Sequence, residues 1–216
     1  MTVKLYIIAT PLGNLEDITL RAQRILRELR YFFVEDTREF FKLLNLLKIS
    51  SEDKKVHSYA AHNMTHATEK ALELLELGNS VGLLTDRGTP AISDPGALLV
   101  RRSHEKAIPV VPVPGPSSVT TLVSVAGLEG TGFVFIGFPP IIKKERTELF
   151  DWLRTGGLPF CCLEAPHRIR ETVMGFKSEF PEGHLFLGRE MTKVFEEYRW
   201  FTLDTLDVTQ LPEKGE

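Results

Sequence analysis

Residues 83–118 constrain the fold of this chain most, because they contain three turns rich in proline, glycine and small residues. The apolar run 81–84 breaks into the turn 85–90, a second turn follows at 93–96, and another apolar run precedes the third turn at 112–118. Such alternation predicts two strands, each followed by a loop and a helix. Ligands bind at the carboxyl ends of strands in open α/β sheets. These loops are therefore the first candidates for a binding site.

Two earlier segments repeat the pattern of strand, turn and helix. Residues 4–10 form an apolar run that stops at Pro11, and the next helix is expected to begin at Thr19. Nucleotide sites of α/β proteins often open in this way, although a plain connection is the simpler explanation. At the far end of the third turn, a helix is expected to begin at Ser117 and Ser118. These serines either cap the helix or bind an anionic group with their hydroxyl and backbone N–H groups.

A charged cluster follows the second predicted strand, 31–34. It consists of Glu35, Asp36, Thr37 and Arg38. We expect Thr37 to cap the helix 39–47, because a threonine hydroxyl accepts hydrogen bonds from the first backbone N–H groups of a helix. The cluster is either a capping and ion-pair arrangement or part of a site.

The chain is expected to form two domains. Residues 127–132 contain three glycines and separate the strand–helix pattern from a different layout. The fold class is therefore α/β, with a mostly parallel αβα domain at 1–127 and a mixed or antiparallel α+β domain at 128–216. Alternation of apolar and polar residues at 196–203 indicates a half-exposed antiparallel strand in the second domain.

Composition narrows the class of protein. The 216 residues carry a net charge of −3, which argues against non-specific coating of nucleic acid but allows a local basic patch. The two cysteines, Cys161 and Cys162, are adjacent, so we expect reduced thiols and a cytoplasmic location. No apolar run is long enough to span a membrane. His62 and His66 have helical spacing for a metal, but no third ligand has suitable spacing, so no metal is expected.

The second half places further charged residues at predicted strand ends. They are Glu164, His167, Arg168, Arg189, Glu190 and Lys193. Residues of these types suit an anionic substrate or proton transfer, and surface ion pairs give the same pattern.

Six motifs together resemble one known family. They are TPLGNLEDIT at 10–19, EDTR at 35–38, GTPAISDPG at 88–96, VPVPGPSS at 111–118, EAPHRI at 164–169 and REMTK at 189–193. In this order they are similar to the bacterial small-subunit ribosomal RNA 2′-O-methyltransferases that modify a cytidine ribose. These enzymes belong to the tetrapyrrole (corrin/porphyrin) methylase superfamily. The resemblance covers nearly the whole chain.

The resemblance implies a two-domain, tetrapyrrole-methylase-like fold that holds S-adenosylmethionine in a cleft between the domains. It also implies a homodimer, and relatives that continue into a small C-terminal helical segment. By position, the resemblance assigns eleven residues to the cofactor: Pro11, Asp86, Arg87, Gly88, Thr89, Pro90, Ile92, Ser117, Ser118, Leu163 and Glu164.

This chain departs from the family pattern at two places. Arg87 stands where related sequences usually have alanine, and Cys162-Leu163 replaces an aromatic pair before Glu164. Both positions adjoin assigned cofactor residues. Either departure is expected to change the affinity for the cofactor.

The implied reaction transfers a methyl group to a ribose hydroxyl of small-subunit ribosomal RNA, either free or in the assembled subunit. A hydroxyl is a weak nucleophile, so a neighbouring base assists it. The candidate catalytic residues are Glu35, Asp36, Asp86, His167 and Glu190. Arg38, Arg168 and Lys193 are candidates for binding RNA phosphates.

Two alternatives remain open. A methyltransferase acting on a tetrapyrrole or another small molecule would share the cofactor site but would need an apolar trough for its substrate. A cofactor-binding relative with little activity would explain the departures at Arg87 and at Cys162-Leu163.

Overall fold

The computed structural model describes residues 2–130 and 132–215. Its internal contacts divide the chain into two compact units, Met1–Ser117 and Ser118–Glu216. The division comes one helix before the expected boundary at 127–132, because α5 (Ser118–Val125) groups with the second unit. Thr131, within that expected boundary, lies outside the described residues.

The first unit is built on a parallel sheet of five strands in the order β3-β2-β4-β1-β5. In chain order the strands are β1 (Leu5–Ile8), β2 (Tyr31–Val34), β3 (Lys55–Ser58), β4 (Val81–Leu84) and β5 (Val110–Val113). All four neighbouring pairs run parallel, which confirms the predicted α/β fold class. Every carboxyl end therefore meets at one edge of this sheet.

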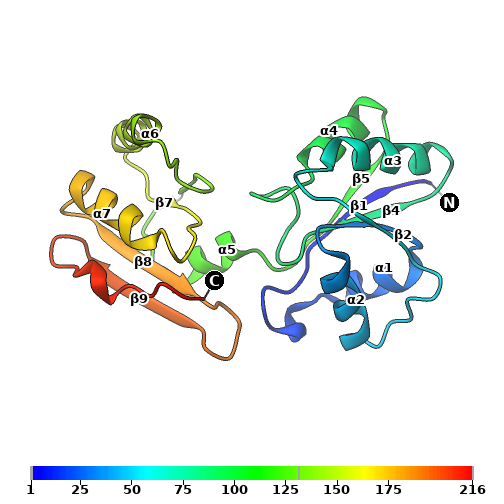
Figure 1. Cartoon of the computed structure of the whole chain (residues 1–216), viewed down its shortest axis with the longest axis horizontal. Coiled ribbons are helices and arrows are strands. Elements are labelled where there is room, and N and C mark those ends of the chain that lie inside the picture. Colours follow the sequence, from blue (N-terminus) through cyan, green and yellow to red (C-terminus); the bar gives the residue numbers. More distant parts are fainter. Residues whose placement is uncertain (1, 131, 216) are drawn as a thin grey trace. The chain divides into compact units, whose positions relative to one another are not determined.

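Helices cover both faces of the sheet (Figure 1). One core contains residues of α1 (Leu20–Glu28) and α2 (Thr37–Leu46). The other contains residues of α3 (Met64–Glu76) and α4 (Ala97–Glu105). Side chains alternate along each strand, so that Phe32 belongs to the first core and Phe33 to the second. Because both faces are buried, strands such as β4 are apolar without alternation.

One strand of this sheet was absent from the sequence prediction. β3 reads KVHS and pairs only with β2, at the edge of the sheet. Its four residues are exposed or half-buried. An edge strand that buries little surface needs no apolar run, so periodicity does not detect it.

The second unit contains two small sheets and two longer helices. β6 (Val134–Phe135) pairs in parallel with β7 (Phe160–Cys161), and β8 (His184–Arg189) pairs antiparallel with β9 (Glu197–Thr202). Its core includes residues of α6 (Lys143–Gly156) and α7 (Ile169–Glu179). The predicted mixed α+β layout with an antiparallel pair is confirmed.

Two 3-10 helices complete the described chain, η1 (Leu15–Asp17) and η2 (Val208–Gln210). Across residues 2–130 and 132–215, no helix combines the length and the apolar character that crossing a bilayer requires.

Candidate functional site

The candidate site lies at the carboxyl edge of the five-stranded sheet. From β1 the chain enters α1 on one face, whereas from β4 it enters α4 on the other face. β1 and β4 are neighbours, so the strand order reverses its direction between them. Ligands of open α/β sheets bind outside such a switch point.

Hydrogen bonds join the loops after β1 and β4 at this point. Thr10 and Gly88 form an antiparallel bridge, in which the Thr10 N–H donates to the Gly88 carbonyl at 2.9 Å and the Gly88 N–H donates back at 3.1 Å. The Thr10 hydroxyl also donates to the Thr85 carbonyl oxygen at 3.2 Å. Thr10 is only 2% exposed, so its hydroxyl serves the loops and not the solvent. The two loops therefore form one connected edge.

The loop after β5 is attached to the same edge. The Thr89 hydroxyl donates to the Pro116 carbonyl oxygen at 2.9 Å. Gly115 approaches the first strand so closely that an added Cβ would lie 2.9 Å from the Cβ of Ala9. Gly88 has a φ of +79° and faces Leu12, which a Cβ would meet at 3.3 Å. The two glycines therefore let the loops pack closely against Leu12 and Ala9, where a side chain would clash.

Two residues of the loop between β4 and α4 have a backbone conformation that is unusual for side chains other than glycine. Ala91 has a φ of +67° and Ser93 a φ of +62°. Such conformations cost about 1 kcal/mol or more and persist only where surrounding contacts hold them. They cluster at functional sites, which is why this loop is the centre of the candidate site.

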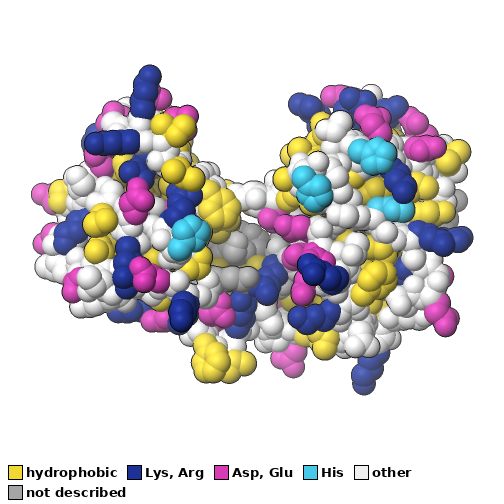
Figure 2. Space-filling view, in the orientation of Figure 1, with side chains coloured by type: hydrophobic (Ala, Val, Ile, Leu, Met, Phe, Trp, Pro, Cys, Tyr) yellow, Lys and Arg dark blue, Asp and Glu magenta, His cyan; other side chains and the backbone are white. Residues whose placement is uncertain are grey.

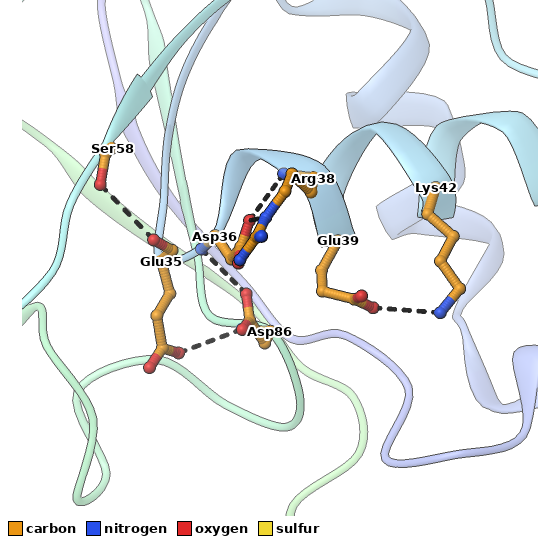
Figure 3. Close-up of polar contacts among 7 residues, drawn as sticks. All are labelled: Glu35, Asp36, Arg38, Glu39, Lys42, Ser58 and Asp86. Atoms are coloured by element: carbon orange, nitrogen blue, oxygen red, sulfur yellow. Dashed lines mark hydrogen bonds and ion pairs between the residues drawn. The ribbon is translucent and has the colours of Figure 1, made fainter.

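Carboxylates meet beside these loops, as Figure 3 shows. The backbone N–H of Asp36 donates to the carboxylate of Asp86 at 3.0 Å, and the N–H of Asp86 donates to Glu35 at 3.3 Å. Asp36 caps α2, since its carboxylate accepts from the N–H of Arg38 at 2.8 Å. The expectation that Thr37 is the cap is wrong: the helix begins at Thr37, one position after its cap.

The three carboxyl groups near this point differ in acidity. Hydrogen bonds from Arg38 lower the pKa of Asp36 to about 2. Partial burial raises the pKa of Asp86, and the charge of Glu35 adds to this effect. Partial burial, together with the charges of Glu35 and Asp86, raises the pKa of Asp94 to about 6. Asp94 belongs to the turn 93–96, but sequence reasoning did not assign it to the site.

The structure brings together the predicted cofactor residues of the first unit. They lie on the loops after β1, β4 and β5, at one edge of the sheet, as Pro11, Asp86, Arg87, Gly88, Thr89, Pro90, Ile92 and Ser117. Ile92 is 42% exposed and Arg87 is exposed, whereas Pro90 is buried. Ser118 is the first residue of α5 and belongs to the second unit.

In the second unit, Glu164 is a buried and fully engaged carboxylate. Its side chain is 3% exposed and lies 3.2 Å from the guanidinium of Arg168. It also accepts from the Ala165 N–H at 2.8 Å and from the Thr172 hydroxyl. Leu163 precedes it and donates its N–H to the Gly137 carbonyl at 2.9 Å. These contacts fix the chain at the carboxyl end of β7.

The basic candidates for RNA binding differ in solvent exposure and in their ion pairs. The Arg38 side chain is 87% exposed, although it pairs with Asp36. Arg168 is 21% exposed and also donates to the Pro139 carbonyl oxygen at 2.9 Å. The ammonium of Lys193 lies 3.0 Å from Glu190, and both side chains are mostly buried. His167 is exposed. The catalytic and RNA-binding roles of these residues stay predictions.

The cysteines and histidines do not form a metal centre within the described ranges, where no group of three or more His, Cys, Asp or Glu side chains is placed to hold an ion. Cys161 and Cys162 are free thiols. Burial raises the pKa of Cys162 to about 12, which keeps this thiol protonated and unreactive at neutral pH.

Sequence comparison gives the chain its relatives. The profile of the tetrapyrrole (corrin/porphyrin) methylases matches residues 4–207. Ribosomal RNA small subunit methyltransferase I of Neisseria meningitidis serogroup B is 44% identical over 195 residues, which are 90% of this chain and 66% of that protein. The protein of the same name from Thermotoga maritima is 38% identical over 195 residues, with 90% and 86% covered. The chain thus spans just under two thirds of the Neisseria relative's length.

Structural comparison supports the same fold. A solved cobalamin biosynthetic enzyme, cobalt precorrin-4 methyltransferase, aligns with a TM-score of 0.67. The alignment covers 93% of this chain and 86% of that one at 18% sequence identity. At this identity the similarity concerns the fold alone, and it confirms the tetrapyrrole-methylase-like architecture expected from the motifs.

Proposed function

Because the chain belongs to the tetrapyrrole (corrin/porphyrin) methylases, and among them to the ribosomal RNA small subunit methyltransferases I, we propose that it methylates small-subunit ribosomal RNA. The acceptor is a ribose 2′-hydroxyl of a cytidine, and the methyl donor is S-adenosylmethionine. The observation that carries this proposal is identity of 38% or more with proteins of that name across 90% of the chain.

The connected loops at the edge of the first unit support a cofactor site there. Gly88 and Gly115 allow close packing of the loops, and the Thr10 and Thr89 hydroxyls hold these loops together. We propose that the loop residues from Asp86 to Ile92, with Pro11 and Ser117, hold the cofactor. Bound there, S-adenosylmethionine supplies a methyl group activated by its sulfonium. Ser118, Leu163 and Glu164 stay predicted contacts.

The choice of base follows from the acidity of the carboxyl groups. Asp36 has a pKa of about 2 and its carboxylate is occupied by Arg38, so it is a poor proton acceptor. Asp86 has a raised pKa and lies next to Glu35. We therefore favour Asp86 or Glu35 over Asp36 as the group that accepts the hydroxyl proton. His167 and Glu190 stay candidates.

The main task of the remaining residues is positioning. An activated methyl group needs an acceptor oxygen in line with the bond that breaks, so orientation of the RNA supplies much of the rate. The exposed Arg38 beside the carboxylates suits a flanking phosphate. Homodimer formation is part of the same proposal, and the substrate is the ribosomal RNA either free or in the assembled small subunit. Methylation of a tetrapyrrole is the alternative, and it rests on the shared fold and on the match to the tetrapyrrole methylase family as a whole.

Calorimetry with S-adenosylmethionine, followed by methyl transfer to small ribosomal subunits and to their free RNA, tests the proposal. We expect wild-type protein to bind the cofactor and to label RNA. Gly88→Val should weaken cofactor binding at least about tenfold, because a side chain strains the backbone at a φ of +79° and presses against Leu12, which displaces the loop. Gly156→Ala, at a position open to solvent, should bind like wild type. Wild-type protein without affinity for the cofactor would contradict the proposal.

A further inference from the structure

The outer face of α1 carries a series of arginines that the proposed site does not use. Arg21, Arg24, Arg27 and Arg30 recur at every third position between residues 20 and 30, where Glu28 is the one acidic residue. The whole chain has a net charge of −3. Positive charge is thus concentrated on one helix of an otherwise acidic protein.

The packing of α1 directs these arginines to solvent. Ala22, Ile25 and Leu26 are buried and form its inner face. The arginines at 21, 24 and 27 are exposed, and Leu20 beside them is 85% exposed. An arginine row on an exposed helical face offers planar donors that suit phosphate groups.

Local interactions of these arginines leave them available to an anion. Arg24 pairs with Glu28 at 2.9 Å, but both side chains are more than half exposed. Arg27 donates to the Gln23 side chain at 3.3 Å. Exposed pairs of this kind contribute about 0.5 kcal/mol, so a phosphate can replace the partner at little cost.

The arginine row starts at the candidate site. Thr19 caps α1 at the end of the loop that leaves β1, so the helix begins at the carboxyl edge of the sheet. Arg38 lies at the start of α2, which begins at the same edge. From Arg21 to Arg27 the helix rises about 9 Å. The row therefore leads away from the site along the surface.

The layer on the opposite face of the sheet is different. There the basic residues of α4 face acidic partners, with Arg102 at 3.5 Å from Glu69 and Lys106 paired with Glu76 of α3. Arg101 pairs with Glu105. Figure 2 shows Lys and Arg among Asp and Glu over this α3/α4 layer. In α1, by contrast, three arginines stand against one acidic residue, Glu28.

We propose that Arg21, Arg24 and Arg27 form a track for the phosphates of RNA that flanks the target nucleotide. This inference rests on the proposed function, since it names the surface by which the substrate reaches that site. The track binds backbone and not bases, so it adds affinity without adding sequence preference.

The test is a triple charge reversal, R21E/R24E/R27E, with R101E/R102E/K106E on α4 as the matched control. Binding of small-subunit RNA is measured without cofactor at several salt concentrations, and methyl transfer to small ribosomal subunits is measured separately. We expect the α1 variant to bind RNA at least about tenfold more weakly, with a salt slope smaller by about two. Cofactor affinity should match wild type, and the α4 variant should keep RNA affinity within about twofold.

Two further measurements separate loss of the arginine charges from added repulsion and from unfolding. Arginine-to-glutamine changes at 21, 24 and 27 remove the charges without adding repulsion from Glu28, and they should give a smaller loss in the same direction. Thermal unfolding checks that both triple variants are folded. Unchanged RNA affinity of the α1 variant, or an equal loss in the α4 control, would overturn the track. RNA binding is measured without cofactor, so the two proposals can fail separately. Wild-type protein that does not bind the cofactor would contradict the proposed function and not the track.

Discussion

Asp94 illustrates how the chemistry of one residue depends on neighbours that are distant in sequence. It lies in the loop between β4 and α4, next to Ser93 with its left-handed backbone. Partial burial opposes its ionisation most, and the charges of Glu35, at the end of β2, and of Asp86, at the end of β4, add to this effect. The ionised form is therefore disfavoured in the folded protein, and the pKa rises from 3.8 to about 6.

Asp94→Asn should stabilise the protein, and the gain should depend on pH. A carboxyl group whose folded pKa is raised opposes folding once it ionises, so its penalty is absent below pH 4 and complete above about pH 6. Thermal unfolding should therefore give the variant an advantage of about 1–2 kcal/mol at pH 7, after allowance for solvent screening. The advantage should shrink to near zero at pH 4.

Asp36→Asn is the control with the opposite sign. Its pKa is lowered to about 2, so it contributes stability above pH 4 that is lost as pH falls toward 2. This variant should be less stable than wild type at pH 7. An equal shift of the Asp94→Asn variant at pH 4 and pH 7 would show that ionisation of Asp94 is not the cause.

At the scale of elements, the loops after β1, β4 and β5 act together. The Thr10–Gly88 bridge and the bond from Thr89 to Pro116 connect three loops that are dispersed along the sequence. The three loops come close enough for these bonds because β1 lies between β4 and β5 in the sheet. A rigid edge loses little further freedom when a ligand binds, which favours affinity.

Thr10→Val should weaken cofactor binding while keeping the fold. Valine has nearly the same shape, but it leaves the Thr85 carbonyl oxygen without the buried donor. We expect a loss of about 1–2 kcal/mol in the free energy of unfolding and a severalfold higher Kd for S-adenosylmethionine by calorimetry. Thr10→Ser retains the hydroxyl and should recover most of the cofactor affinity. If valine and serine bind the cofactor equally well, the hydroxyl does not position the loops.

At the scale of the whole molecule, each compact unit has a core of its own. Two cores lie on the two faces of the first sheet, and the third lies within the second unit. In that third core the ring of Phe176 contacts the rings of Phe150 and Phe160, at centroid distances of 5.5 Å and 5.3 Å. Stability is therefore supplied separately within each unit.

Phe176→Ala should destabilise the second unit selectively. Truncation of a phenylalanine that is 5% exposed costs about 3–5 kcal/mol. Hydrogen exchange followed by mass spectrometry should show faster exchange in α7 and β8, while the amides of β1 and β4 keep their protection. Equal loss of protection in β1 and β4 would contradict separate stabilisation of the two units.

Much of the fold follows from local patterns in the sequence. The runs at 31–34 and 81–84 coincide with β2 and β4, since strands covered on both faces are continuously apolar. Turn residues after them placed the candidate loops correctly, and the six motifs identified the family. β3 was not predicted because an edge strand that buries little surface has no apolar run in the sequence. The cap of α2 was displaced by one residue because Asp36 and Thr37 are both good caps.

The tertiary structure alone decided which of these residues meet. The strand order β3-β2-β4-β1-β5 brings Asp36 beside Asp86 and Thr10 beside Gly88, although neither pair is close in the sequence. Partial burial in the folded chain raises the pKa of Asp94. The fold also places Glu164 in an ion pair with Arg168. Sequence patterns record what each segment buries and where it turns, because these are local properties. Acidity and hydrogen bonding at the site depend on distances between segments, which only the folded chain defines.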